Sequence, residues 1–264
     1  MKWWIRTGVL LLGMTIGFCK MPVIKVGSGD RVSRSIRYVA LGDSIASGYG
    51  LSVPETDSYV GLVGSYLEEN YDYVFKANLG TNGLRSDQLL DILTDPENEK
   101  YKKYHATLEN ADIVTLSIGS NDLLHLVSLN RDLQDYIEEG DQMFREACRE
   151  FDNHFPKIIQ EIHKISPNAE IYANNVYNPC GDISGFGNIY DLTERYVELL
   201  NKSFSKPEEY TLVDIKEEFD ESEEGLLNMA ISGKELDPHP NKKGHAKIGS
   251  KVIQAIMDGG KGGK

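Results

Sequence analysis

Short apolar runs alternate with amphipathic segments along most of the chain. Runs rich in β-branched and aromatic residues predict strands at Ile36–Gly42, Tyr73–Gly80, Asp112–Gly119, Ala169–Tyr177 and Tyr210–Ile215. Apolar residues that recur at three- and four-residue steps predict helices at Ser58–Glu69, Ser86–Leu93, Asp141–Ile165, Leu192–Ser205 and from near Lys243. Because each strand is followed by a helix, the pattern implies one parallel sheet with helices on both faces.

Three of the predicted strands end in a polar loop that contains glycine. Ser44 follows the first strand in Gly-Asp-Ser, Gly83 follows the second, and Asn121 follows the third in Gly-Ser-Asn-Asp. Ligands bind beyond the carboxyl ends of parallel strands, so these loops are candidates for chemistry. Each motif alone is equally typical of a turn or a helix cap.

A fourth polar motif, Leu-Asp-Pro-His-Pro-Asn, precedes the last predicted helix. Its two prolines favour an extended backbone around Asp237 and His239. Residues two apart in an extended chain point the same way, so the carboxylate can orient the imidazole.

Together, these motifs resemble those of the SGNH or GDSL-like hydrolases. That family has Gly-Asp-Ser early, a central glycine, Gly-x-Asn-Asp in mid-chain and an Asp–His pair near the end, and here Gly42-Asp43-Ser44, Gly83, Gly119-Ser120-Asn121-Asp122 and Asp237-Pro238-His239 stand in that order. The resemblance implies a flavodoxin-like three-layer α/β/α sandwich with a five-stranded parallel sheet. It covers about 200 residues, from Gly42 to His239.

The resemblance also implies a mechanism for cleaving carboxylic esters. Ser44 is expected to be the nucleophile, His239 the base and Asp237 the residue that orients the base. The backbone N–H groups of Ser44 and Gly83 and the side chain of Asn121 are expected to form the oxyanion hole. This chemistry requires neither a metal nor an organic cofactor.

One departure from the family pattern leaves the third catalytic residue open. The family places its aspartate three residues before the histidine, where this chain has Leu236, whereas Asp237 lies one residue closer. Either Asp237 reaches His239, or a backbone carbonyl near Leu236 orients the imidazole. We favour Asp237 because a carboxylate also stabilises the imidazolium that forms during catalysis.

The activity admits alternatives. The same site suits a thioesterase or a lysophospholipase, and the fold also suits a glycan-binding protein that has lost turnover. Lipid, small-molecule and carbohydrate esters all remain open as substrates. The formal net charge of -13 disfavours nucleic acid as a partner, and nothing in the sequence implies a stable protein partner.

The N-terminus has the layout of a secretory signal. Lys2 and Arg6 precede an apolar run that ends near Phe18, so we expect a signal peptide or an uncleaved anchor at residues 1–19 and a secreted protein. Cys19 is a weak candidate for lipidation. A polar linker (20–35), the hydrolase domain (36–258) and a flexible Gly/Lys tail (259–264) are expected to follow.

The remaining cysteines and histidines suggest structural roles. Cys148 and Cys180 are expected at the same end of a helix and the following strand, where they either form a disulfide or stay reduced. The other histidines lack metal-ligand spacing and are interpreted as surface or packing residues: His105, His125, His154, His163 and His245.

Overall fold

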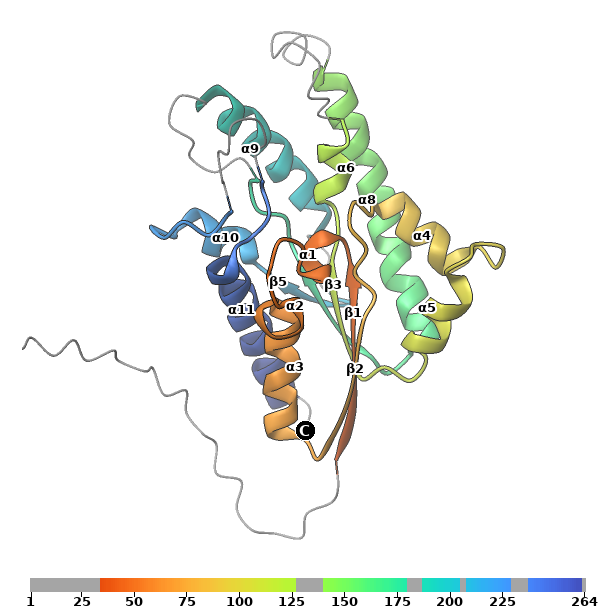
Figure 1. Cartoon of the computed structure of the whole chain (residues 1–264). Coiled ribbons are helices and arrows are strands. Elements are labelled where there is room, and N and C mark those ends of the chain that lie inside the picture. The colour runs from red at the N-terminus through yellow and green to blue at the C-terminus, as the bar shows by residue number, and fades with distance from the viewer. Residues whose placement is uncertain (1–33, 127–139, 180–186, 205–207, 229–236, 263–264) are drawn as a thin grey trace, which may run out of the picture. The chain divides into compact units, whose positions relative to one another are not determined.

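The strands form one parallel sheet at the centre of the molecule (Figure 1). The computed structural model describes residues 34–126, 140–179, 187–204, 208–228 and 237–262. The strands are β1 (Ser35–Gly42), β2 (Tyr73–Asn78), β3 (Ile113–Ser117), β4 (Glu170–Asn174) and β5 (Thr211–Val213). All five agree in position with the predicted strands, and each is paired in parallel with its neighbours.

The strand order is β2-β1-β3-β4-β5, which is the flavodoxin-like order. The chain therefore reverses its direction of travel across the sheet between β1 and β3. Gly42 pairs with Ser117, and Ser117 pairs with Asn174, so the carboxyl ends of the three middle strands lie at the same level. The expected fold class is confirmed, and this reversal point is where such folds hold their ligands.

Helices cover both faces of the sheet. The described helices are α1 (Ser44–Ser47), α2 (Pro54–Asp57), α3 (Tyr59–Asn70), α4 (Ser86–Thr94), α5 (Tyr101–Leu108), α6 (Ser120–Leu124), α8 (Gly140–Ile165), α9 (Gly187–Asn201), η1 (Lys202–Phe204), α10 (Ile215–Asp220) and α11 (Lys242–Gly262). Alternate residues of the buried strands feed two separate cores. Val39 and Leu41 pack with α4, α5, α8 and α9, whereas Tyr38 and Ala40 pack with α3 and α11.

Several predicted boundaries differ from the structure for local reasons. Strand β2 ends at Asn78 and not at Gly80, because the Asn78 side chain turns the chain by binding the backbone of Gly80 and Ala46. The short helices α5 and α10 were not predicted, since neither has a long apolar period. Helix α11 continues to Gly262, so the tail expected to be flexible from Gly259 is helical in part.

A close contact explains the extension of α11. A Cβ on Gly259 would lie 2.8 Å from the hydroxyl oxygen of Tyr172, so glycine is what lets the helix pass this buried side chain of the sheet. The expected signal (1–19) and the expected linker (20–35) lie outside the described residues up to residue 33, and β1 already begins at Ser35, inside the expected linker. Within the described part of the chain, no helix is both long and apolar enough to span a bilayer.

Candidate active site

Ser44 lies in a tight connection between β1 and α1. Gly42 has a φ of +135°, and a Cβ there would lie 2.0 Å from the carbonyl oxygen of Ser117. Only glycine allows the backbone to pass so close to Ser117. The N–H of Asp43 donates to the same Ser117 carbonyl at 2.9 Å and so holds the two segments together. The Asp43 carboxylate then accepts from the N–H of Ile45 at 2.9 Å and caps α1. The connection thus fixes Ser44, the first residue of the helix.

The Asp43 carboxylate is fully buried behind the serine. Its second oxygen, Oδ2, has no hydrogen-bond partner among the described residues. Burial raises the pKa of Asp43 to about 7, although the hydrogen bond from Ile45 opposes the rise. The Asp43 carboxylate thus caps α1 from a buried position, and its titration falls close to neutral pH.

His239 connects Ser44 to Asp237 in one continuous chain of contacts. The Nε2 atom of His239 lies 2.9 Å from the Ser44 Oγ, and its Nδ1 lies 2.6 Å from an Asp237 carboxylate oxygen. That carboxylate oxygen also accepts from the backbone N–H of His239 at 3.1 Å. The one-residue gap between aspartate and histidine is therefore long enough, because Asp237 folds back over the peptide that follows it.

These contacts define the tautomer of the imidazole. A carboxylate only accepts hydrogen bonds, so Nδ1 carries the proton and Nε2 accepts from the serine hydroxyl. Burial acts to raise the pKa of Asp237, but the hydrogen bonds from His239 outweigh it and leave the pKa below its ordinary value. Asp237 is therefore ionised, as an imidazole-orienting group needs to be. Leu236, the alternative, lies outside the described residues.

Gly83 and Asn121 lie on neighbouring loops that are joined to each other. Gly83 has a φ of +76°, and no atom lies within 4 Å of the position where its Cβ would be. The side-chain nitrogen of Asn121 donates to the carbonyl oxygen of Leu84 at 3.1 Å, which leaves its second N–H for another acceptor. On the other side, the Ser47 hydroxyl of α1 donates to Asn82 at 2.5 Å. The loops after β1, β2 and β3 are therefore linked at their ends.

The carboxylate of Asp122 joins the same two loops at a second point. Its carboxylate accepts from the backbone N–H of Ser86, the first residue of α4, at 3.1 Å and from the Ser86 hydroxyl. The Ser86 oxygen also contacts Nδ1 of His154 on α8 at 3.1 Å. All the side-chain oxygens of this cluster lie in buried or half-buried positions. His154, interpreted from the sequence as a surface or packing residue, therefore also contacts the loops beside the site.

Three residues near the site carry no sequence motif that singles them out. Asn228 donates to Asp237 Oδ2 at 3.1 Å, and the Tyr177 hydroxyl donates to the carbonyl of Pro238 at 3.0 Å. The ring of Tyr49, which is 48% exposed, lies 4.6 Å from the ring of His239. Tyr177 alone had a positional signal, since it was the last residue of a predicted strand.

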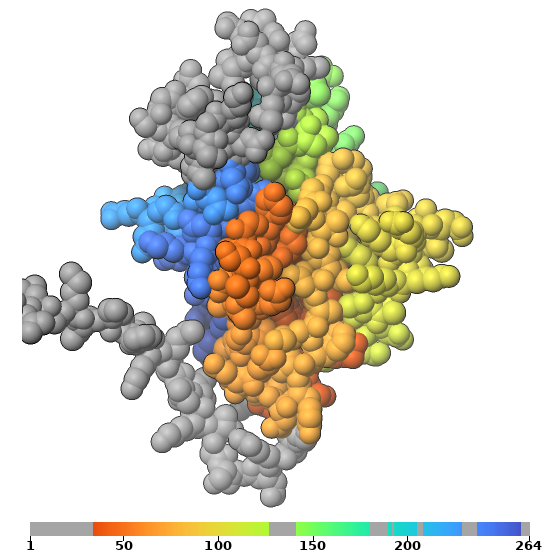
Figure 2. Space-filling model, in the orientation of Figure 1, coloured from red at the N-terminus to blue at the C-terminus, as the bar shows by residue number. Residues whose placement is uncertain are grey.

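The surface around the site is formed by distant parts of the chain. In Figure 2, orange residues of the first helices lie between blue C-terminal residues and the yellow part of the chain that follows β2. A cavity of about 590 Å³ opens beside Gly83, against α4 and the loop before α5. Its lining is largely polar: Thr81, Asn82, Asp87, Gln88, Asp91, Asn98, Glu99 and Lys100 contribute to it.

The remaining cysteine and histidine predictions have separate outcomes. Cys148 is a free, buried thiol whose pKa is raised to about 11 by burial. Cys180 lies outside the described residues, so the disulfide stays a prediction.

His245 is fully buried, and its Nδ1 accepts from the N–H of Tyr59 at 3.3 Å. No metal-binding group of three or more side chains occurs within the described ranges.

The fold and the site together define a class. A parallel α/β/α sheet carries, at its carboxyl edge, a carboxylate, an imidazole and a serine hydroxyl in hydrogen-bonded series, the arrangement used by serine hydrolases. Residues 40–247 match the GDSL-like lipase/acylhydrolase family. The chain belongs to this family and is a hydrolase of the lipase and esterase type.

The chain also resembles individual proteins in sequence and in fold. The chain is 29% identical over 233 residues to "Uncharacterized protein YpmR" of Bacillus subtilis (strain 168). The aligned residues make up 87% of this chain and 85% of that protein. The lipase Lip_vut3 from a goat rumen metagenome superposes with a TM-score of 0.63 at 21% identity, over 83% of this chain and 97% of that one. An extracellular lipase from Streptomyces rimosus has a TM-score of 0.63 at 16% identity, over 83% and 99%. At these identities, the two structures show a common fold.

Proposed function

We propose that this protein is a serine ester hydrolase that cleaves carboxylic esters through an acyl-enzyme on Ser44. The observation that carries the proposal is the unbroken chain of contacts from Asp237 through His239 to the Ser44 hydroxyl. The carboxylate of Asp237 faces Nδ1 of the imidazole, so that Nε2 faces the serine hydroxyl whose proton it would take. Membership of a lipase and acylhydrolase family supports the same reaction.

The proposed reaction has two halves. In the first, Ser44 Oγ attacks the ester carbonyl while His239 Nε2 takes the hydroxyl proton and then delivers it to the leaving alcohol. The new bond joins Oγ to the acyl carbon, and the bond to the alcohol oxygen breaks. In the second half, His239 takes a proton from water, the resulting hydroxide attacks the acyl carbon, and Ser44 leaves with the proton returned by the imidazole.

The negative oxygen that forms in each half needs donors fixed in advance. We assign this role to the backbone N–H groups of Ser44 and Gly83 and to the free N–H of Asn121. The hydrogen bond from Asn121 to Leu84 supports the assignment, because it fixes the amide without using both of its protons. The open space above Gly83 supports it as well, since no side chain obstructs that N–H.

The substrate is proposed only as a class of small esters or lipids. The polar cavity beside Gly83 suits a hydrophilic leaving group better than an acyl chain, because an acyl chain would bury those polar groups without replacing their hydrogen bonds. Thioesters and lysophospholipids remain alternative substrates. A non-catalytic glycan-binding protein is disfavoured, because binding alone needs no ionised aspartate aligned with a histidine and a serine.

A hydrolysis screen tests the proposed function. The purified chain would be assayed on p-nitrophenyl esters of increasing chain length, an acyl thioester, acetylated sugars and lysophospholipids, beside the Ser44→Ala variant. We expect the wild-type protein to hydrolyse esters and Ser44→Ala to abolish this turnover. The variant should stay folded, since it loses only one oxygen atom at the carboxyl edge of the sheet. Equal turnover by the two proteins would refute the role of Ser44, and failure on every ester would favour the binding alternative.

We further propose that the protein is exported. The charged and then apolar order of residues 1–19 supports this, and fractionation of the producing cells would test it.

A further inference from the structure

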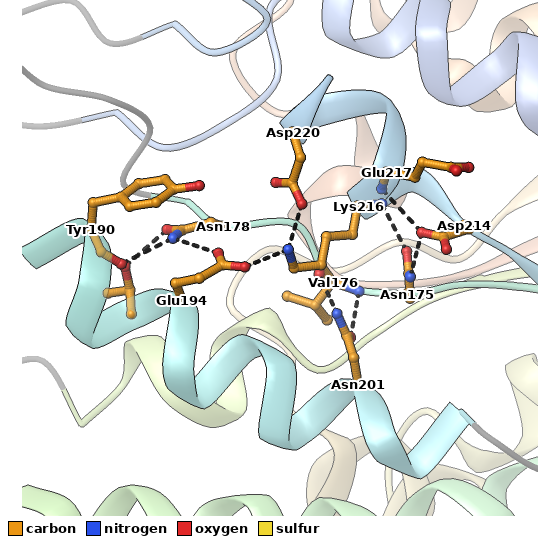
Figure 3. A network of polar contacts seen from close by, with 11 residues as sticks. Asn175, Val176, Asn178, Tyr190, Glu194, Asn201, Asp214, Lys216, Glu217 and Asp220 are labelled. Carbon is orange, nitrogen blue, oxygen red and sulfur yellow. Dashed lines mark hydrogen bonds and ion pairs between the residues drawn. The ribbon is translucent and has the colours of Figure 1, made fainter. Parts of the chain in front are cut away.

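The residues that follow β4 form a rigid extension of the strand, here called the β4 extension (175–178). The side-chain oxygen of Asn175 accepts from the N–H of Ile215 at 2.9 Å and so holds the start of α10. On the other side, the side chain of Asn201 binds both the N–H and the carbonyl of Val176, at 2.9 and 2.7 Å. Figure 3 shows Asn201 of α9 bound to Val176, and Asn175 bound to Asp214 and Lys216 at the start of α10.

Further contacts tie α9 and α10 to each other across the extension (Figure 3). The Asn178 side chain donates to Glu194 of α9 at 2.9 Å. The ammonium of Lys216 lies 2.5 Å from Glu194 and 2.5 Å from Asp220 of α10. Burial acts to lower the pKa of Lys216, but the two carboxylates outweigh it and raise the pKa, so the group stays charged.

Tyr177 projects from this fixed extension toward the catalytic segment. Its ring stacks on Phe219 of α10, with centroids 4.2 Å apart and planes 12° from parallel. Its hydroxyl donates to the carbonyl of Pro238, the residue between Asp237 and His239, at 3.0 Å. Burial raises the pKa of Tyr177 well above its ordinary value, so the hydroxyl keeps the proton that it donates.

Asn228 holds the other side of the same segment. Its side-chain nitrogen donates to Asp237 Oδ2 at 3.1 Å, and its backbone N–H donates to the carbonyl of His239 at 2.9 Å. Residues 237–240 belong to no helix or strand, apart from one isolated bridge between Pro240 and Leu227. Two side chains from elsewhere in the sequence therefore fix the peptides on which the base is mounted.

We propose that Tyr177 and Asn228 are positioning residues, which hold the Asp237–His239 pair so that the imidazole meets the Ser44 hydroxyl. This inference rests on the proposed function of the site. Neither residue touches a reacting atom. Each acts by limiting the motion of the imidazole, and a displacement of about 1 Å in a catalytic group can cost about 100-fold in rate.

The first test removes one oxygen atom. Tyr177→Phe keeps the ring stack and loses only the hydrogen bond to Pro238, so we expect kcat to fall about tenfold with KM within about twofold of wild type. Tyr172→Phe is the matched control, because it also removes the hydroxyl of a buried tyrosine. The Tyr172 side chain lies on β4, where its hydroxyl donates to Glu170 at 2.7 Å and lies against Gly259 of α11. A tenfold loss in both variants, or in neither, would overturn the proposal.

Asn228→Ala provides a second variant, with the same expected loss in kcat. It keeps the proposal testable if Tyr177→Phe does not fold. Wild-type kcat in folded Asn228→Ala protein would remove Asn228 from the assignment.

A measurement that does not depend on turnover separates this inference from the proposed function. The Nδ1 proton of His239 gives an NMR resonance that reports its hydrogen bond to Asp237. We expect this resonance to shift or broaden through faster exchange in Tyr177→Phe and Asn228→Ala, and to stay unchanged in Tyr172→Phe. An unchanged resonance in both positioning variants would refute the inference even in an active enzyme. A shifted resonance in a protein without esterase activity would refute only the proposed function.

Discussion

Ser44 and His239 meet at one hydrogen bond, but the segments that carry them are held by different means. The Ser44 loop is fixed mainly by backbone contacts, through the close approach of Gly42 to Ser117 of β3, and by the Asp43 side chain that caps α1. The segment with His239 has one isolated backbone bridge and backbone hydrogen bonds to residues 226–228, and the side chains of Tyr177 and Asn228 hold it in addition. The Ser44 loop therefore depends on a short motif beside a neighbouring strand, whereas the segment with His239 also depends on side chains that only the folded chain brings to it.

The two regions should therefore fail in different ways. The Ser44 loop should tolerate changes in most nearby side chains but not the addition of a Cβ at its glycine. The catalytic segment should lose activity stepwise, as each of its polar contacts is removed. The predictions that follow begin with the largest expected effect.

The largest effect is expected for Asp237→Asn. The variant keeps the shape of the side chain but favours the wrong imidazole tautomer, so kcat should fall by about 10⁴-fold, as in serine proteases with the analogous change. Asp57→Asn, which removes a carboxylate bound to Lys242 outside the site, is the control and should stay close to wild type. A loss of about tenfold or less for Asp237→Asn would show that the backbone orients the imidazole.

Asn121→Ala should have the next largest effect. Losing one oxyanion donor costs about 2.7–4 kcal/mol of transition-state stabilisation, so kcat should fall by about 10²–10³-fold with little change in KM. Steady-state kinetics with one ester would measure both constants. A change confined to KM would move Asn121 from the oxyanion hole to substrate binding.

Gly42→Ala should break the Ser44 loop through the fold itself. The new Cβ would overlap the Ser117 carbonyl at a φ of +135°, so the free energy of unfolding should fall by about 3 kcal/mol. Gly225→Ala is the control, since no atom lies within 4 Å of its Cβ position. Denaturant titration would measure both, and equal stabilities would mean that the loop has room to relax.

The last prediction concerns the buried charge of Asp43, whose effect on stability appears only as the pH changes. Its pKa is about 7 in the folded protein, against 3.8 as the reference value. The folded state therefore binds the proton more tightly, and stability that is fully present below about pH 4 is lost as the pH rises through about 7. Asp43→Asn carries no such charge, so its stability relative to wild type should increase with pH over this range. A difference that does not change with pH would contradict the raised pKa.

The fold was predictable because its signals are local and repeated. Five apolar runs, each followed by an amphipathic helix, correspond to the five strands of the sheet. The short helices α5 and α10 were not predicted, because each contains too few turns for apolar residues to recur at three- and four-residue steps. The helical end of α11 was not predicted because the glycines of residues 259–262 indicate flexibility, and only the packing of Gly259 against Tyr172 explains their conformation.

The part of the site that lies in short sequence motifs was predictable. Ser44, Asn121 and His239 were found from the residues around them, and the structure places Ser44 and His239 in contact. Tyr177 and Asn228 lie 61 and 9 residues from their partners in the catalytic segment, so their contacts exist only in the folded chain. No local pattern encodes them.

The central claim, that His239 activates Ser44 as a nucleophile, is tested most directly by a fluorophosphonate probe. The probe bonds covalently only to an activated serine, so no ester substrate needs to be known. We expect one adduct per chain, mapped by mass spectrometry to Ser44, with labelling abolished in Ser44→Ala and strongly slowed in His239→Ala. An unlabelled wild-type protein, or an adduct on another residue, would contradict the account.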